Sequence, residues 1–435
     1  MADAPKPFHI IVLSVFGVAA VVGLFIFANF SGGGQGKAEV GTVVIWGTLP
    51  KTPIENAIAE LSGADDRFAD VQYVEKSASG FGNALADALA SGTGPDLVII
   101  TQEMLAAERS KLSYIPYESL PQRTFLDTYV PLFELFLGAQ GTYGIPLAVD
   151  PMVLYYNRAI LSSAAVAAPP STWEAVSGFA SAVTRRDERG AIGRSAIALG
   201  EYGNVRNARG ILSLMLLQSG SSITETTING TRATLADDTD ADGGATPAES
   251  AVNYYAQYAD PAKTVYSWNR SLPDSRQVFL SGELALYLGF ASELSFLSSA
   301  NPNLDFDMVK APMPGTARNR ITYGVGYAFA VPRAAPNPSG GMQAAFALGS
   351  STYAPRIAAG LGLAPAHRSA LGSSASDPYR AIYYPEALVA EGWISPSPAQ
   401  TDQVFSAMIA DITSGRAGVD EALSGAAQSI DAALR

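Results

Sequence analysis

Residues 144–160 place two extended segments on either side of an acidic residue and a proline. Residues 145–149 are apolar, and residues 152–156 form a β-rich run of the kind that makes a buried strand. Pro151 has a fixed φ and keeps Asp150 out of the helical region. Because an unpaired buried carboxylate costs free energy, we predict that Asp150 lies in a cleft where the chain crosses between two lobes. A solvated aspartate in a turn is the alternative.

Strands and helices alternate between residues 42 and 100. The predicted elements are a strand at 42–46, a helix at 53–61, a strand at 71–74, a helix at 81–90 and a strand at 97–100. This alternation indicates a βαβ sheet. Ligands bind at the carboxyl ends of the strands in open sheets of this kind, so Trp46, Gly47 and Thr48 are candidate ligand-binding residues.

The composition excludes several classes of function. With a formal net charge of −12, the chain is a poor partner for nucleic acid or for an anionic membrane surface. The chain has no cysteine, so we expect neither disulfides nor a thiolate nucleophile nor a cysteine-linked lipid. Its two histidines, His9 and His367, exclude a zinc site with several histidine ligands.

Residues 9–30 form an almost unbroken apolar run. As a helix this run would span about 33 Å, enough to cross the hydrocarbon core of a membrane. We predict an uncleaved anchor at 9–30, a cytoplasmic tail at 1–8 and a glycine-rich tether at 31–41. The protein would then be single-pass, with its C-terminal domain outside the cytoplasm. A cleaved secretory signal is the alternative.

Residues 238–249 read DTDADGGATPAE and match the calcium-loop pattern D-x-D-x-D-G-x5-E. The candidate ligands of a structural calcium are Asp238, Asp240, Asp242 and Glu249. The alternative is an acidic surface loop, because Thr246 and Glu249 also fit a capping box at the start of a helix. We expect no other cofactor.

The region around Asp150 resembles a known family. Tyr143-Gly144-Ile145-Pro146, Val149-Asp150, Tyr156-Asn157, Pro169-Pro170 and Thr172-Trp173-Glu174 are similar to the first inter-lobe crossing of the extracellular solute-binding proteins of ABC importers, in the group that includes the maltose-binding protein. The resemblance extends from residue 42 to the C-terminus. It implies an α/β fold of two lobes joined by three crossings (the type II periplasmic-binding-protein fold). The apolar run at 9–30 would place one transmembrane helix before this fold, in which the chain departs from the better-known members.

The resemblance also implies lobe boundaries and further site residues. Lobe 1 would comprise 42–148 and 330–366, and lobe 2 would comprise 149–329 and 367–435. The family's ligand-facing positions correspond here to a loop at 101–103, to Asp150, to the end of a strand at 284–290, and to a second crossing at 322–326. A strand expected at 197–202 leads to a second-lobe loop with two more candidates. The additional ligand-binding candidates are Thr101, Gln102, Glu103, Tyr202, Asn204, Trp268, Phe290, Ala291, Tyr323 and Gly324.

These observations predict a membrane-anchored binding protein, not an enzyme, that delivers a solute to an ABC permease. A sugar is the expected solute, because aromatic faces stack on sugar rings while carboxylates and amides bond hydroxyls. One alternative is an anchored glycan-active enzyme with Glu103 and Asp150 as its acid and nucleophile. The other is a ligand-sensing or surface-binding module on the same fold.

Overall fold

In the computed structural model, which describes residues 40–227, 230–237 and 244–435, the stretch around Asp150 forms one long strand. This strand, β6 (Ile145–Asn157), has 13 residues, and all of them except Tyr156 are buried. A run of apolar residues buried on both faces is what a central strand of an α/β sheet requires. The strand does not break at Pro151, which lies where the pairing of β6 passes from β13 to β11.

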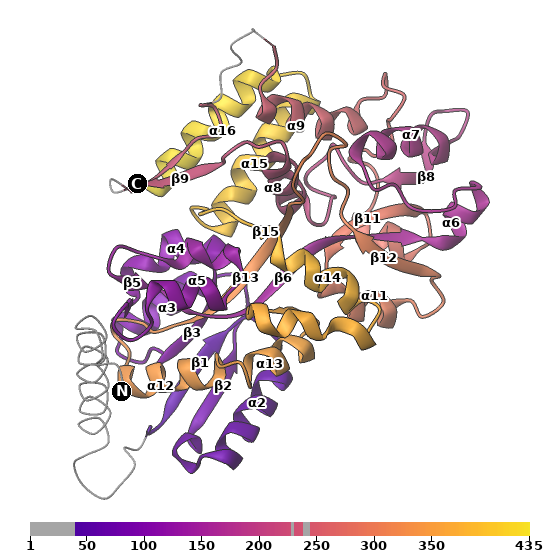
Figure 1. Ribbon diagram of the computed structural model, residues 1–435. Helices are drawn as coiled ribbons and strands as arrows, with labels where there is room; N and C mark the ends of the chain where they lie inside the picture. The colour runs from indigo at the N-terminus through magenta and orange to yellow at the C-terminus, as the bar shows by residue number, and fades with distance from the viewer. Residues whose placement is uncertain (1–39, 228–229, 238–243) are drawn as a thin grey trace, which may run out of the picture. The chain divides into compact units, whose positions relative to one another are not determined.

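Strand β6 carries the main sheet from one half of the fold to the other (Figure 1). The first part of β6 pairs antiparallel with β13 (Thr322–Ala330), from Ile145 opposite Phe329 to Pro151 opposite Gly324. The second part pairs antiparallel with β11 (Leu284–Phe290) and with β12 (Phe306–Lys310). The whole sheet has 11 strands. Its main path runs in the order β2 (Val71–Glu75), β1 (Val43–Gly47), β3 (Leu97–Thr101), β13, β6, β11, β8 (Ile192–Ile197) and β7 (Arg185–Arg186).

The first half of the fold packs helices against parallel strands. Its strands and helices are β1 (Val43–Gly47), α2 (Lys51–Ala64), β2 (Val71–Glu75), α3 (Phe81–Ala90), β3 (Leu97–Thr101), α4 (Gln102–Glu108), β4 (Ile115–Pro116), α5 (Gln122–Thr128), β5 (Gly141–Thr142), α12 (Pro338–Leu348) and α13 (Ala354–Gly360), with short 3-10 helices at Asp66–Phe68, Arg109–Lys111 and Pro131–Phe136. Helix α2 buries Ile54, Ala57, Ile58 and Leu61, the spacing of a single helical face.

The second half continues the sheet from β6. Its elements are α6 (Arg158–Ser163), α7 (Trp173–Val183), β7 (Arg185–Arg186), β8 (Ile192–Ile197), α8 (Ala208–Gln218), β9 (Thr224–Thr227), β10 (Gly230–Ala233), α9 (Pro247–Ala256), a 3-10 helix at Gln257–Ala259, α10 (Ser275–Leu280), β11, α11 (Glu293–Ala300) and β12. Helix α8 is buried at nine of its 11 residues, because other elements of this half surround it.

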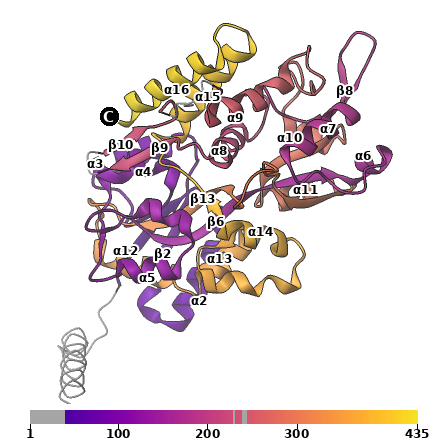
Figure 2. The same cartoon turned by 45° about the horizontal axis from the view of Figure 1, so that its top comes forward.

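The C-terminal region returns across the sheet and then joins the second half. Its elements are β14 (Ala364–Pro365), a 3-10 helix at Arg368–Ser376, α14 (Arg380–Leu388), β15 (Ala390–Glu391), α15 (Pro398–Thr413) and α16 (Val419–Leu434). The short strands β14 and β15 pair with β6 and β13. Helices α15 and α16 lie side by side next to α8 and α9, as Figures 1 and 2 both show.

The predicted helix at 81–90 and strand at 284–290 are confirmed residue for residue by α3 and β11. Two expectations were wrong. The strand expected at 197–202 ends at Ile197, because the chain turns at Gly200, whose φ of +94° is a conformation that favours glycine. Residues 101–103 do not form a loop, because α4 begins at Gln102 directly after β3.

The predicted anchor at 9–30 and the tail at 1–8 lie outside the described residues. Among the described residues, no helix is both long enough and apolar enough to cross a membrane. The lobe boundaries stay a prediction, although the observed architecture is an α/β fold with two halves built on one sheet.

Candidate functional site

A pocket of about 460 Å³ brings together side chains that lie as far as 299 positions apart in the sequence. It combines α4 of the first half with the loop before α8, the end of β11, β13 and the start of α15. The lining residues are Glu103, Tyr202, Gly203, Val205, Arg206, Asn207, Ala208, Arg209, Gly210, Asp274, Phe290, Tyr323 and Asp402. Four of these, Glu103, Tyr202, Phe290 and Tyr323, are sequence-predicted site residues.

Arg209 joins carboxylates from two regions of the chain across this pocket. Its Nε and Nη2 donate to Oε1 and Oε2 of Glu103 at 3.0 and 3.2 Å. Its Nη1 donates to Oδ2 of Asp402 at 2.7 Å. The forked guanidinium therefore holds both carboxylates in fixed positions at once, an arrangement that a lysine could not reproduce.

Two tyrosine hydroxyls complete this network. Tyr323 donates to Oε1 of Glu103 at 2.5 Å, and Tyr202 donates to Oδ1 of Asp402 at 2.5 Å. Burial raises the pKa of both phenols, and the neighbouring carboxylates raise it further, so both remain donors at neutral pH. Burial by itself would lower the pKa of Arg209, but Glu103 and Asp402 raise it, and the guanidinium stays charged.

The aromatic side of the pocket is held by a second polar cluster. Phe290 ends β11, and its backbone N donates to Oε1 of Glu293 at 3.0 Å. The same oxygen accepts from Nδ2 of Asn207 at 2.7 Å, and the Tyr287 hydroxyl donates to Oε2 at 2.6 Å. The ring of Phe290 meets that of Tyr323 edge to face at 6.3 Å. These contacts fix an aromatic surface beside the charged network.

The pocket is therefore suited to a small, neutral and hydroxyl-rich ligand. Its charged lining residues are the carboxylates Glu103, Asp274 and Asp402 and the guanidinium groups of Arg206 and Arg209, so opposite charges nearly balance. Ion-paired carboxylates and guanidinium groups can accept and donate hydrogen bonds to hydroxyls, while Phe290 and Tyr323 offer apolar ring surface. No metal-binding cluster of histidine, cysteine and carboxylate side chains occurs among the described residues.

Gln102 is turned away from the pocket and into the sheet. Its Nε2 donates to the carbonyl of Gly324 at 2.9 Å, and its Oε1 accepts from the backbone N of Gly326 at 2.8 Å. The side chain is fully buried. Thr101 is buried at the end of β3 and does not line the pocket. Gln102 thus holds α4 against β13 and leaves Glu103, the next residue, in the pocket wall.

Asp150 is buried in β6 and bound to the loop that follows β11. Its Oδ1 accepts from the backbone N of Ser292 at 3.0 Å, and its Oδ2 accepts from the Ser292 hydroxyl at 2.5 Å. Burial raises the pKa of Asp150 to about 7, although the bonds from Ser292 oppose this shift. Neighbouring Ala291 is buried and donates its backbone N to the carbonyl of Pro151 at 3.0 Å. Neither Asp150 nor Ala291 lines the pocket.

Asn204 and Trp268 form an internal pair instead of a ligand-facing one. Trp268 is fully buried, and its Nε1 donates to Oδ1 of Asn204 at 3.0 Å. Nδ2 of Asn204 donates to the carbonyls of Asn269 and Leu272 at 2.9 and 2.8 Å. The amide of Asn204 is therefore used within the protein, where it fixes the loop beneath Tyr202.

The candidates at the end of β1 lie away from the pocket. The ring of Trp46 is half-buried, and Nζ of Lys76 sits 3.7 Å from its centroid. Gly47 has no room for a side chain, because a Cβ would meet the Tyr73 hydroxyl at 2.8 Å, and Thr48 follows it.

At Gly324 a Cβ would meet Ala390 at 2.9 Å, so the close neighbour of this glycine is β15.

The candidate calcium loop is described only in part. Asp238, Asp240 and Asp242 lie outside the described residues. Glu249 forms the capping box of α9: its Oε2 accepts from the Thr246 backbone N at 3.1 Å, and its own N donates to Oγ1 of Thr246 at 3.2 Å. The helix start thus accounts for Glu249, and calcium binding by this loop stays a prediction.

Three lining residues with important contacts, Arg209, Asp402 and Asn207, were not among the sequence-predicted candidates. One signal for Arg209 exists, because a charged residue at the start of an apolar, buried helix needs a partner. Asp402 gives no such signal. It lies in the first turns of α15, where an aspartate is an ordinary helix-surface residue until the fold brings Arg209 to it.

Comparisons with known proteins give one matching family model. The family model of the bacterial extracellular solute-binding protein matches residues 57–381. A search of curated protein sequences found no match.

Solved structures similar to this chain share its fold at low sequence identity. The cyclic α-maltosyl-1,6-maltose binding protein from Arthrobacter globiformis matches with a TM-score of 0.72 and 16% identity, over 90% of this chain and 98% of its own. The GacH receptor of Streptomyces glaucescens, solved with and without acarbose, matches with a TM-score of 0.68 and 16% identity, over 90% of this chain and 98% of its own. An ABC transporter solute-binding protein from Thermotoga lettingae, bound to α-D-tagatose, matches with a TM-score of 0.66 and 18% identity, over 91% of this chain and 100% of its own.

Proposed function

Because this chain belongs to the family of bacterial extracellular solute-binding proteins, we propose that it captures a small carbohydrate between its two lobes and delivers it to an ABC importer. The observation that carries the proposal is the pocket at Arg209, which joins Glu103 of the first half to hydrogen-bonding and aromatic side chains of the second. The family consists of binding proteins, so the chain is a binding protein and not a glycan-active enzyme.

The proposed ligand is a sugar because of the chemistry of the lining. Glu103, Arg209 and Asp402 offer fixed acceptors and donors for adjacent hydroxyls, and Phe290 with Tyr323 offers ring faces. Similar folds have been solved with acarbose, with α-D-tagatose and with maltotetraose bound. These ligands are therefore the first probes to use.

Closure of the two lobes on the ligand is the proposed mechanism. Glu103 belongs to the first half, whereas Arg209 and Asp402 belong to the second, so a ligand that contacts all three favours the closed arrangement. The Glu103–Arg209 ion pair stabilises the same arrangement before the ligand arrives. A permease would then recognise the closed lobes.

The proposed lobes follow the boundaries expected from the sequence, 42–148 with 330–366 and 149–329 with 367–435. The family places the binding domain outside the cytoplasm. We further propose that residues 9–30 anchor it to the membrane through the tether at 31–41, since their length and apolar character suit a membrane span. Such an anchor would keep the captured sugar close to the permease.

A thermal-shift screen of the full-length protein tests this function. Maltose, maltotetraose, mannobiose, α-D-tagatose and acarbose serve as probes, with amino acids and peptides as controls. Ligands that bind only the folded state raise the unfolding temperature by mass action, so we expect at least one sugar to raise it in a saturable manner. The Glu103→Gln variant should require at least tenfold more of that sugar. If peptides raise the unfolding temperature and no sugar does, the proposed ligand class is refuted.

A further inference from the structure

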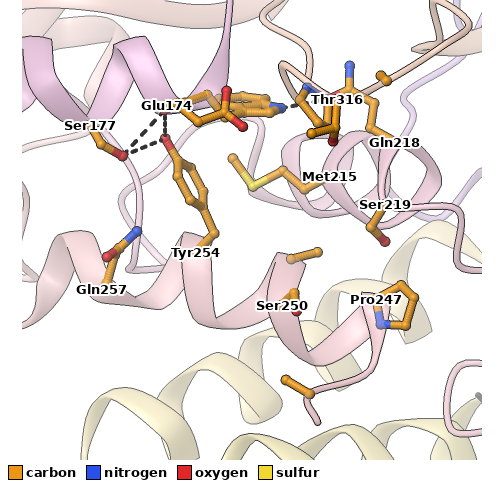
Figure 3. A pocket seen from close by; sticks show the side chains of 15 residues that line it. Glu174, Ser177, Met215, Gln218, Ser219, Pro247, Ser250, Tyr254, Gln257 and Thr316 are labelled. Carbon is orange, nitrogen blue, oxygen red and sulfur yellow. Dashed lines mark hydrogen bonds between the residues drawn. The ribbon is translucent and has the colours of Figure 1, made fainter. Parts of the chain in front are cut away.

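A second and larger hollow, of about 1040 Å³, lies within the second half of the fold. It shares no lining residue with the pocket at Arg209. The start of α7, the end of α8, one face of α9 and the segment 314–317 surround it (Figure 3). Because all of these elements belong to one half, occupancy of this hollow does not depend on closure between the lobes.

The inner wall of this hollow is aromatic and apolar. Trp173 is 6% exposed, and its ring lies 5.7 Å from that of Tyr254 at an interplanar angle of 61°. Its only polar side-chain atom, Nε1, donates to Oε1 of Gln218 at 2.7 Å. The thioether of Met215 adds a polarisable surface. Two aromatic rings and a thioether therefore line this side of the hollow, and Tyr254 is the most exposed of the three.

The aromatic wall is held rigidly by internal hydrogen bonds. The Tyr254 hydroxyl donates to the carbonyl of Trp173 at 2.5 Å and lies 2.6 Å from the hydroxyl of Tyr258. The Ser177 hydroxyl lies 3.2 Å from both tyrosine hydroxyls, and Figure 3 shows its bond to Tyr254. Since these polar groups are already paired, they orient the rings without competing for a ligand.

Glu174 is the single charged residue among the described residues that line this hollow. Its two carboxylate oxygens accept from one donor, the backbone N of Gly315, at 3.2 and 3.1 Å. Within the described part of the chain it has no ion-pair partner. In Figure 3 the Glu174 side chain lies on the same side of the hollow as the Tyr254 hydroxyl and Met215. The hollow thus combines a negative charge with aromatic and thioether surfaces.

From this combination we propose that the hollow binds a small organic cation, a protonated amine carried on an apolar body. The ammonium group would pair with Glu174 and lie against the aromatic wall, and the apolar body would fill the space over Met215. The side chains of Ser250, Gln257 and Thr316 make no hydrogen bond within the described chain and can serve polar groups of the ligand. The net charge of −12 further favours a cation.

Ligand-observed NMR titrations of the full-length protein test this site. The probe is 2-phenylethylammonium chloride, and 2-phenylethanol is its neutral counterpart. We expect saturable binding of the amine and at least tenfold weaker binding of the alcohol. Glu174→Gln, which keeps an acceptor for Gly315, should weaken amine binding about tenfold. Ser250→Trp adds bulk at an exposed position on the wall of the hollow and should abolish binding.

Glu188→Gln serves as the matched control, because this exposed carboxylate lies outside both pockets, and it should bind the amine like the wild type. Equal affinity for the amine and the alcohol would overturn the proposal, as would amine binding that Glu174→Gln or Ser250→Trp leaves unchanged. Absence of saturable amine binding at millimolar concentration would overturn it as well. The Glu103→Gln variant should bind the amine normally, so failure here and failure of the sugar site are distinguishable.

Discussion

Arg209 is the residue on which the geometry of the main pocket depends. It binds Glu103 with two nitrogens and Asp402 with a third, so it positions two acceptors that lie 299 positions apart in the sequence. Removing one partner of such a partly buried ion pair leaves the other charge poorly solvated. The three residues therefore act as a unit and not as independent contributors.

A double-mutant cycle measures this dependence. Glu103→Gln and Arg209→Gln should each lower the free energy of unfolding, whereas the double variant should lose less than the sum of the two. We expect a coupling of about 1–3 kcal/mol from urea unfolding monitored by circular dichroism. The exposed pair Arg123 and Asp127, 3.7 Å apart, provides a control cycle with a coupling below about 1 kcal/mol. Additive effects of the first pair would show that the bridge contributes nothing to the fold.

The raised pKa of Asp150 predicts that the stability of the protein depends on pH. Its pKa is raised to about 7 by burial, above the ordinary value of 3.8, so the folded state binds its proton more tightly than the unfolded state does. Its contribution to stability is therefore fully present below pH 3.8 and is lost as the pH rises through about 7. The loss amounts to roughly 4 kcal/mol at most.

The Asp150→Asn variant isolates this contribution, because an amide does not ionise. It should be more stable than the wild type at pH 8, and the difference should shrink as the pH falls toward 4. Thermal unfolding of both proteins between pH 4 and pH 8 gives the comparison. A constant difference at every pH would mean that Asp150 is not the titrating group.

At the scale of elements, Gln102 shows how one side chain fixes a helix to a strand. Its amide bonds the backbone of Gly324 and Gly326 on β13, and no water-exposed surface remains on it. Truncation would leave a buried carbonyl and a buried N–H without partners. Each such group costs about 1–3 kcal/mol, so the position of α4, and with it of Glu103, depends on Gln102.

We expect Gln102→Ala to lower the free energy of unfolding by about 2–5 kcal/mol and to weaken sugar binding through displacement of Glu103. Gln122→Ala, at an exposed position in α5, is the control and should change stability by less than about 0.5 kcal/mol. Urea unfolding measures both variants. Wild-type stability in Gln102→Ala would contradict the role given to its two backbone bonds.

Much of the element order was predictable from sequence, since strands such as β6 and helices such as α3 have a strong local pattern. Residues 101–103 show the limit of this approach. A polar Gln-Glu pair after a buried strand is typical of a loop, and only the pairing of β13 with β3 explains why Gln102 turns inward. For Trp268 and Asn204, the bond between them decides their roles, and such a contact has no local signature.

For the whole molecule, the central claim is that a sugar is held between two lobes that share one sheet. Strands β6 and β13 pair at the centre of this sheet, and the ion pair from Glu103 to Arg209 spans the pocket. The chain contains no cysteine, so two introduced cysteines can be labelled without interference. Asn83 on α3 and Ala182 on α7 are exposed positions in different halves, and neither lines either pocket.

Pulsed electron–electron double resonance on the spin-labelled Asn83→Cys/Ala182→Cys protein tests the claim most directly. The sugar selected by the thermal screen is added to saturation, which calorimetry on the same sample verifies. We predict that the distribution of label–label distances narrows and shifts on sugar binding, and that Glu103→Gln reduces the shift at the same sugar concentration. An identical distance distribution with and without saturating sugar would contradict capture by closure of the two lobes.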